Sequence, residues 1–194
     1  FTAMSNVLGT ITPVRELCRA AHDAGAIAIV DGCQYVPHNV TDVQAWDADF
    51  LAFSSHKLCG PSGIGVLWGR EELLDAMPPF LGGGNMIADV RLDGFTTAEL
   101  PAKFEAGTPP IIEAVGFGAA IEFLEGIGMT EVRRHEMQVA DYALRTLTER
   151  FGDGARLRLT HGDMCDRAAH SPCVAACSRA DSSCTASPMC VTMS

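Results

Sequence analysis

Polar side chains that suit a covalent cofactor site follow two short apolar runs of the sequence. Asp31 directly follows the run Ala-Ile-Ala-Ile-Val at 26–30, and Lys57 lies shortly after the run Phe-Leu-Ala-Phe at 50–53. An unprotonated lysine amine in a crevice can form a Schiff base with a carbonyl group. Arginine cannot replace it, because its guanidinium stays charged. Lys57 is therefore the first candidate for a residue that binds a carbonyl compound covalently.

The carboxylate of Asp31 suits a site that holds a protonated ring nitrogen. Pyridoxal phosphate (PLP) has a pyridine nitrogen that must keep its proton if the ring is to withdraw electrons, and a neighbouring carboxylate stabilises that proton. Two structural alternatives stay open at this point. Asp31 could cap the turn of the Asp-Gly pair at 31–32, and Lys57 could be an ordinary solvated lysine.

The elements that must position these residues alternate between helix and strand along residues 1–154. The expected elements are a helix from Thr12 to Gly25 with Thr12 as its N-cap, a strand at 26–30, a short helix at 42–46 capped by Thr41, strands at 50–53 and 63–68, and a short helix at 71–76. Such alternation predicts an α/β fold with a mainly parallel sheet. Ligands bind outside the carboxyl ends of the strands in open α/β sheets. Asp31 and Lys57 fall there, and Asn6 precedes the first helix.

Regular structure is less evident after the short helix expected at 71–76. Residues 79–109 are rich in Gly and Pro with weak periodicity, so we expect a long loop with little regular structure. Two helices are expected after it, at 111–125 and at 130–151 with Thr130 as cap.

The sequence changes character after Leu159. Residues 160–194 contain no Leu, Ile, Phe, Tyr or Trp, although they hold five of the eight cysteines. Such a segment has too little large apolar surface to offset its ordering entropy, so we expect a disordered tail at 155–194. The tail has no C-x-x-C pair and the other cysteines are scattered. We therefore expect neither a metal site nor a disulfide framework.

Composition limits the classes of partner. The 194 residues carry a formal net charge of −10, with 47% hydrophobic residues. That hydrophobic content suffices for one domain and part of a second, while the negative charge disfavours nucleic acid and anionic lipid. The sequence has no apolar run of about 18 residues, so we expect no membrane span. The first residues do not resemble a signal peptide, so we expect a cytoplasmic protein.

Five segments resemble, in order and spacing, the successive blocks of class V aminotransferase-fold enzymes. They are Ser-Asn-Val-Leu-Gly-Thr at 5–10, Val-Asp-Gly-Cys-Gln at 30–34, Phe-Ser-Ser-His-Lys-Leu-Cys-Gly-Pro-Ser-Gly-Ile-Gly at 53–65, Gly-Gly-Gly-Asn-Met-Ile at 82–87 and Phe-Glu-Ala-Gly-Thr-Pro at 104–109. The last two segments are more specific and resemble the SUF-type cysteine desulfurases. The similarity is continuous from Ser5 to about Phe151.

This resemblance implies a PLP fold type I enzyme that works as a homodimer. It also implies a role for each matched residue. Lys57 would hold the cofactor in a Schiff base, Asp31 would pair with the ring nitrogen, Gln34 would hydrogen-bond the ring hydroxyl oxygen, Ser54 and His56 would contact the phosphate, Asn6 would lie beside cofactor and substrate, and Thr108 would reach the phosphate held by the other subunit.

The reaction implied by the resemblance converts L-cysteine to L-alanine. It leaves a persulfide on an enzyme cysteine, which passes sulfur to an acceptor protein of a SUF-like system for iron–sulfur cluster assembly. Family alternatives are a selenocysteine lyase or another class V lyase. An alternative of a different class is a non-catalytic remnant that binds PLP weakly or not at all.

The chain also departs from the family pattern. The histidine that stacks on the cofactor would lie upstream of Asn6, and the catalytic cysteine with its substrate-binding arginine would lie beyond residue 154, where neither motif is found. We therefore interpret the chain as a fragment. Residues 1–126 would be the C-terminal part of the PLP-binding large domain, 127–154 the linking helix and start of the small domain, and 155–194 an unmatched tail.

Overall fold

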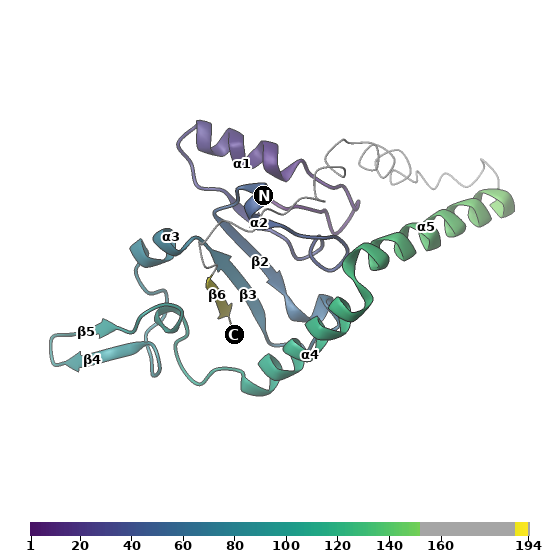
Figure 1. The fold of residues 1–194 in the computed structure, drawn as a ribbon. Coiled ribbons are helices and arrows are strands. Elements are labelled where there is room, and N and C mark those ends of the chain that lie inside the picture. The colour runs from purple at the N-terminus through teal and green to yellow at the C-terminus, as the bar shows by residue number, and fades with distance from the viewer. Residues whose placement is uncertain (152–188, 194) are drawn as a thin grey trace.

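A mixed four-stranded sheet forms the centre of the molecule, with strand order β1-β2-β3-β6 (Figure 1). The computed structural model describes residues 1–151 and 189–193. Its elements are α1 (Val14–Asp23), β1 (Ile29–Asp31), α2 (Val43–Trp46), β2 (Phe50–Ser54), the 3-10 helix η1 (Ser55–Lys57), β3 (Gly65–Gly69), α3 (Glu71–Ala76), β4 (Ile87–Arg91), β5 (Gly94–Thr97), the 3-10 helix η2 (Ala102–Phe104), α4 (Ile111–Ile127), α5 (Met129–Phe151) and β6 (Met189–Met193).

Strand directions confirm the α/β class and correct the expectation of a mainly parallel sheet. β1 runs parallel to β2, with Asp31 opposite Ala52, whereas β3 runs antiparallel to β2 and β6 antiparallel to β3. The segment 55–64 that joins β2 to β3 explains the reversal. A parallel return needs a crossover of about a dozen residues or more, usually with a helix, and this segment is shorter than that.

The prediction of a disordered tail at 155–194 is wrong for its last residues. Met189–Met193 form β6, which pairs with β3 along the whole of that strand, from Gly65 opposite Met193 to Gly69 opposite Met189. The unpaired edge of β3 offers backbone donors and acceptors to any extended segment that reaches it. Apolar surface was therefore not the deciding quantity for these residues. The rest of the expected tail, 155–188 and 194, lies outside the described residues.

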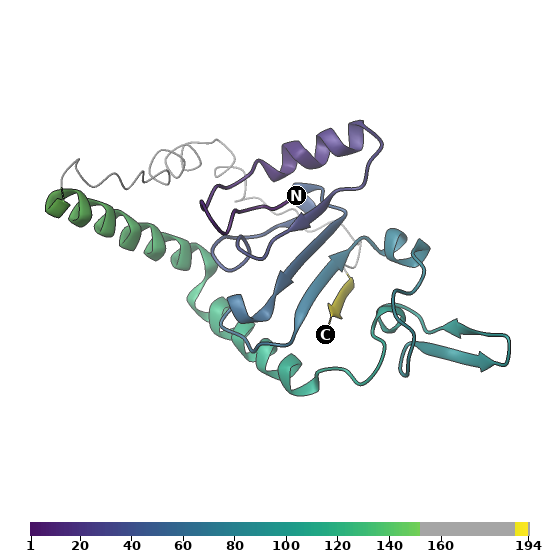
Figure 2. The same ribbon diagram turned by 180° about the vertical axis from the view of Figure 1, so that it is seen from behind.

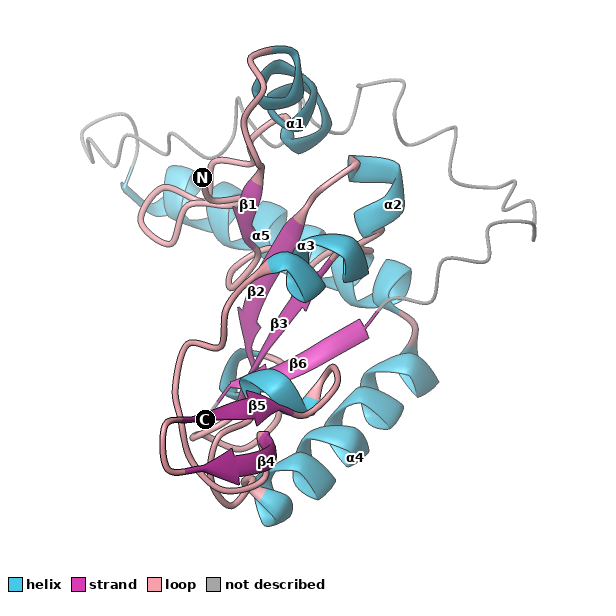
Figure 3. Ribbon diagram, turned by 90° about the vertical axis from the view of Figure 1, so that its left-hand side faces the viewer, coloured by secondary structure: helices cyan, strands magenta, loops and turns pink. Residues whose placement is uncertain are grey.

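The sheet has one well-covered face and one that is partly bare. Two clusters of apolar side chains cover the first face, one packed with α1 that includes Val30 and Leu51, and one packed with α4 that includes Val66. Figure 3 shows where α1 and α4 lie beside the sheet. Side chains alternate along a strand, so Ile29 and Asp31 point to the opposite face. Both are exposed, Ile29 at 57%. The carboxylate of Asp31 is thus on the open side of the sheet.

A β-hairpin replaces much of the loop expected at 79–109, so that expectation is wrong. β4 and β5 pair antiparallel and project from the body (Figures 1 and 2). Nearly all side chains of the two strands are exposed. An unpacked hairpin has no buried face to require alternating apolar residues, and the sequence therefore lacked the period that marks a strand.

The helix boundaries also differ from those expected at several ends. α1 begins at Val14, because the hydroxyl of Thr12 donates to the carbonyl of Thr2 (2.7 Å) and does not cap the helix. Asp42, not Thr41, caps α2 by accepting from two backbone N–H groups. α5 starts at Met129, so Thr130 lies inside it.

None of the helices within 1–151 has the length and hydropathy to cross a membrane.

A network of four charged side chains ties α1 to the sheet. Asp49 is buried and accepts from the N–H of Ala28 (2.7 Å) and from Nε2 of His22 (2.8 Å), while Nε of Arg70 lies 3.0 Å from its other oxygen. Asp47 pairs with the same Arg70 and His22. The hydrogen bond to Asp49 raises the pKa of His22. Burial alone raises the pKa of Asp49, but its three partners outweigh burial and the pKa falls below its ordinary value.

This network predicts how the free energy of unfolding depends on pH. The raised pKa of His22 gives stability that is present below its ordinary value of 6.5 and disappears as pH rises through the folded-state pKa. The lowered pKa of Asp49 gives stability that is present above 3.8 and disappears as pH falls through the folded-state pKa. His22→Gln should therefore cost more stability near pH 5.5 than near pH 8.5 in urea unfolding. An equal cost at both pH values would contradict the network's role.

Candidate functional site

Three parallel chain segments end side by side and bring together the polar residues singled out from the sequence. Residues 1–4 run alongside β1, with the N–H of Ala3 donating to the carbonyl of Asp31 (2.8 Å). On the other side of β1, the N–H of Gly32 donates to the carbonyl of Ala52 in β2 (2.9 Å). Asn6, Asp31 and Ser54 therefore leave the sheet at the same edge, as the sequence predicted.

Asp31 has both a structural and a chemical capacity. Its Oδ1 accepts from the N–H of Cys33 (2.9 Å), so the turn-capping interpretation is correct. The other carboxylate oxygen accepts no hydrogen bond from the described residues. Asp31 also lines an open hollow of about 380 Å³, together with Phe1, Thr2, Ile29, Val30 and Ala52. One oxygen can thus hold the turn while the other faces a ligand.

Lys57 is held at the end of β2 by a tight turn. The carbonyl of Ser55 accepts from the N–H groups of Leu58 (2.8 Å) and Gly60 (3.1 Å). A Cβ at Gly60 would come within 2.2 Å of the Ser55 hydroxyl oxygen, so only glycine fits there. Lys57 itself is half-buried and its amine has no partner among the described residues, while His56 is exposed. The amine is available to a ligand.

The other lysine of the chain is occupied. Lys103 is buried, and its Nζ donates to the carbonyls of Leu74 (3.3 Å) and Asp75 (2.7 Å) at the carboxyl end of α3. Its Nζ also lies 5.5 Å from the centre of the Phe104 ring. A cation at this end of a helix satisfies carbonyls that lack intrahelical partners. Lys103 therefore has a structural role, which leaves Lys57 as the lysine whose amine is open to a ligand.

Cys33, two residues after Asp31, lies beside the end of β2. Its Sγ is 3.6 Å from Oγ of Ser54, so the loop after β1 touches the end of β2. Gln34 follows in the same loop and is half-buried. The structure thus brings Asp31, Gln34 and Ser54 into one neighbourhood with Lys57.

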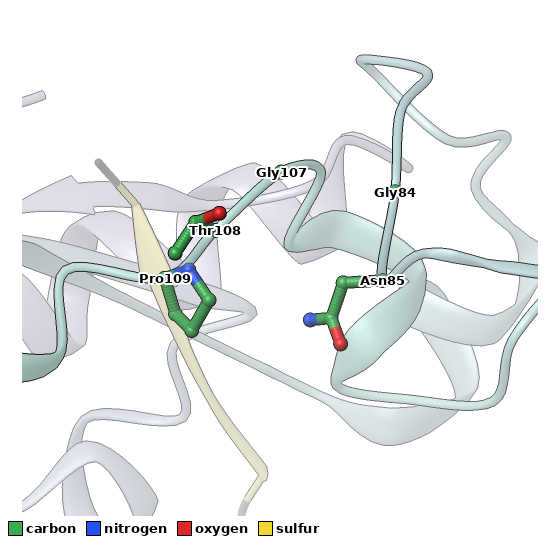
Figure 4. Close-up of a pocket in the computed structure, with 5 residues that line it drawn as sticks. All are labelled: Gly84, Asn85, Gly107, Thr108 and Pro109. Atoms are coloured by element: carbon green, nitrogen blue, oxygen red, sulfur yellow. The ribbon is translucent and has the colours of Figure 1, made fainter.

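Thr108 lies in a second hollow, apart from the one lined by Asp31. This hollow of about 460 Å³ is lined by Gly84, Asn85, Gly107, Thr108 and Pro109. Figure 4 shows Thr108 and Pro109 on one side and the amide of Asn85 on the other. The two glycine-rich segments are joined by the N–H of Gly107, which donates to the carbonyl of Gly84 (2.8 Å). Asn85 had no role in the sequence prediction, although it lies in one of the matched segments.

Comparison with known protein families shows which family the chain belongs to. The model of the aminotransferase class-V family matches residues 1–163. The chain belongs to this family. A probable cysteine desulfurase of Streptomyces coelicolor is 53% identical over 149 residues, which cover 77% of this chain and 36% of that protein. A cysteine desulfurase of Haloferax volcanii is 53% identical over 146 residues, or 75% of this chain and 34% of that protein.

Solved structures agree with the family assignment. The apo cysteine desulfurase of Thermococcus onnurineus superposes with a TM-score of 0.73 at 45% identity, covering 76% of this chain and 37% of that one. Cysteine desulfurase CsdA of Escherichia coli, in its S-sulfonic acid form, gives 0.66 at 48% identity, covering 67% and 33%. The fold is PLP fold type I. The chain spans only about a third of the length of these proteins.

The residues at the sheet edge fit PLP, the cofactor that the family assignment brings. A free amine, a carboxylate, a hydroxyl and an imidazole lie at or just after the carboxyl ends of two neighbouring parallel strands. These groups match the aldehyde, ring nitrogen and phosphate of PLP. Within the described residues no group of three or more His, Cys, Asp or Glu side chains gathers as a metal site would require.

Proposed function

We propose that this chain is part of a PLP-dependent cysteine desulfurase that converts L-cysteine to L-alanine and supplies sulfur for iron–sulfur clusters. The observation that carries the proposal is that Asp31 ends β1 while Lys57 follows shortly after the end of β2, the parallel neighbour of β1. Relatives at 53% identity that are named cysteine desulfurases support it. Lys57 would hold the cofactor, and Asp31 would keep its ring nitrogen protonated.

The family resemblance implies a task for each matched residue, and the chemistry of each side chain suits that task. PLP, when bound, supplies an electron sink for bonds at the substrate Cα. The Lys57 amine would hold the cofactor covalently and move a proton at the substrate Cα once substrate has displaced it. Asp31 would hold the ring nitrogen protonated, and Gln34 would donate to the ring hydroxyl oxygen. Ser54 and His56 would bind the phosphate, with Asn6 beside the substrate.

Sulfur transfer needs groups that the described residues do not supply. The C–S bond of L-cysteine would break, and the sulfur would pass to an enzyme thiolate to form a persulfide. A proton would then add to the substrate Cβ to give alanine. No cysteine of the described segment stands where the family nucleophile is expected. We assign that thiolate, and the arginine for the substrate carboxylate, to parts of the protein outside residues 1–151. A sulfur-acceptor protein of a SUF-like system would then remove the sulfur.

A homodimer is the second part of the proposal. Thr108 lines a hollow separate from Asp31 and is exposed. The family resemblance implies that Thr108 reaches a phosphate held by a second subunit, and its exposed place outside the hollow of its own chain's Asp31 is compatible with that role. The hydrogen bond between Gly107 and Gly84 would fix this hydroxyl for that contact. The cytoplasmic location expected from composition stays a prediction.

Chemical labelling tests the lysine assignment directly. Borohydride added to the PLP-loaded protein should fix the cofactor to Lys57, because the Lys103 amine is held by two helix carbonyls. Peptide mapping by mass spectrometry locates the label. Label on Lys103, or on neither lysine despite binding of PLP, would contradict the site.

Product analysis then separates the candidate reactions. The full-length protein should form alanine from L-cysteine, and an added thiol reductant should release the persulfide sulfur as sulfide. Activity restricted to selenocysteine would identify a selenocysteine lyase. Absence of PLP binding and of both products would favour the non-catalytic remnant.

A further inference from the structure

A hydrogen bond between two distant parts of the chain lies next to the candidate cofactor site. Nδ1 of His38 is 2.7 Å from Oε1 of Glu136, although the two residues are 98 positions apart. His38 lies in the loop that follows β1, and Glu136 lies on α5. Both side chains are about one third exposed, at 35% and 36%. Because an ionised carboxylate only accepts, the Nδ1–H of His38 is the donor.

The loop transmits the position of His38 to the residues after Asp31. The N–H of His38 donates to the carbonyl of Tyr35 (3.1 Å), and the N–H of Tyr35 donates to the carbonyl of Gly32 (2.9 Å). Two linked turns therefore run from His38 back to Gly32. Gln34 lies inside them.

Among the described residues, the apolar packing of α5 against the core clusters is concentrated at the start of the helix. α5 buries no residue completely, and it projects from the body in the views of Figures 1 and 2. Its partly buried Met129 and Val132 pack beside α4 at its start. Glu136 lies one turn beyond Val132. A contact at that distance from the pivot resists swinging of the helix more effectively than packing at its first turn.

We propose that His38 and Glu136 form a latch that couples the direction of α5 to the position of the cofactor loop, with His38 as a positioning residue. The inference rests on the proposed function, because only a bound cofactor gives the loop position a consequence. Coupling between two sites is reciprocal. Opening the latch should weaken PLP binding, and PLP binding should steady α5.

Matched variants distinguish a contact that positions the cofactor loop from one that only stabilises the fold. Glu136→Ala and His38→Ala each remove the contact, whereas Glu136→Gln keeps an acceptor oxygen at the same reach. Glu131→Gln is the control, because it disturbs an exposed pair with Arg134 on the same helix that does not touch the loop. Each alanine variant should weaken PLP affinity about five-fold or more, and the double variant no further than the single ones. Glu136→Gln should restore much of the loss, and Glu131→Gln should lose none.

Hydrogen exchange supplies a readout that does not need the cofactor. Glu136→Ala should speed exchange of the amides at 33–39 in the apo protein, and PLP should slow exchange around Glu136 in the original protein. A lower melting temperature with unchanged PLP affinity and unchanged loop exchange would show a purely structural contact and overturn the latch. If the original protein fails to bind PLP, the proposed function falls. The apo exchange result then decides separately whether the contact holds the loop.

Discussion

Lys57→Met in the full-length protein is expected to lower turnover of L-cysteine by at least about 100-fold, the lower end of what a positioned acid–base group contributes. Methionine keeps the length and apolar stem of lysine but has no amine to hold the cofactor or to move a proton. The half-buried Lys57 has no hydrogen bond or ion pair within the described residues that its loss would break. Alanine release at saturating cysteine and PLP measures the effect.

The second lysine provides a matched control for this substitution. Lys103→Met removes two hydrogen bonds at the end of α3 and should lower the free energy of unfolding by about 1–3 kcal/mol. Turnover per folded molecule should stay close to that of the original protein. Loss of turnover in Lys103→Met together with retention in Lys57→Met would reverse the assignment of the two amines.

The site edge could be predicted because it depends on local rules. Buried strands read as short apolar runs, and parallel neighbours end on the same side of a sheet. Those two facts placed Asn6, Asp31 and Ser54 together without any knowledge of distances. The tight turn after β2 was not among the expectations from the sequence. The structure adds the close contact that makes Gly60 necessary.

Features that depend on distant partners could not be read from the sequence. Asp49 follows no apolar run and its neighbours do not suggest a buried charge, yet it pairs with His22 and Arg70 from other elements. The contact between His38 and Glu136 likewise joins residues 98 positions apart. Local periodicity carries no information about such pairs, because they depend on how elements pack after they form.

Elements without a buried face were missed or misjudged for a related reason. The hairpin β4–β5 is exposed on nearly every residue, so selection for a core left no alternation in its sequence. β6 was missed because its pairing satisfies the backbone edge of β3. Hydrogen-bonding demand at a sheet edge is invisible to an argument based on apolar surface alone.

Asp31→Asn should leave PLP bound but lower turnover of the full-length protein by about 100-fold or more, because the electron sink weakens when the ring nitrogen loses its proton. The substitution separates two roles that the structure gives to one side chain. Asn keeps a carbonyl oxygen that can still accept from the N–H of Cys33, so the turn after β1 should survive. Only the negative charge is removed.

Comparison with Asp31→Ala completes the argument, because alanine removes the charge and the turn contact together. The alanine variant should lose turnover as the asparagine variant does, and should also lose about 1 kcal/mol of unfolding free energy along with some PLP affinity. Alanine release, PLP absorbance and urea unfolding measure the three effects on the same samples. If Asp31→Asn keeps its turnover while Asp31→Ala loses stability and turnover together, Asp31 acts only through the turn. The ring nitrogen would then need another partner.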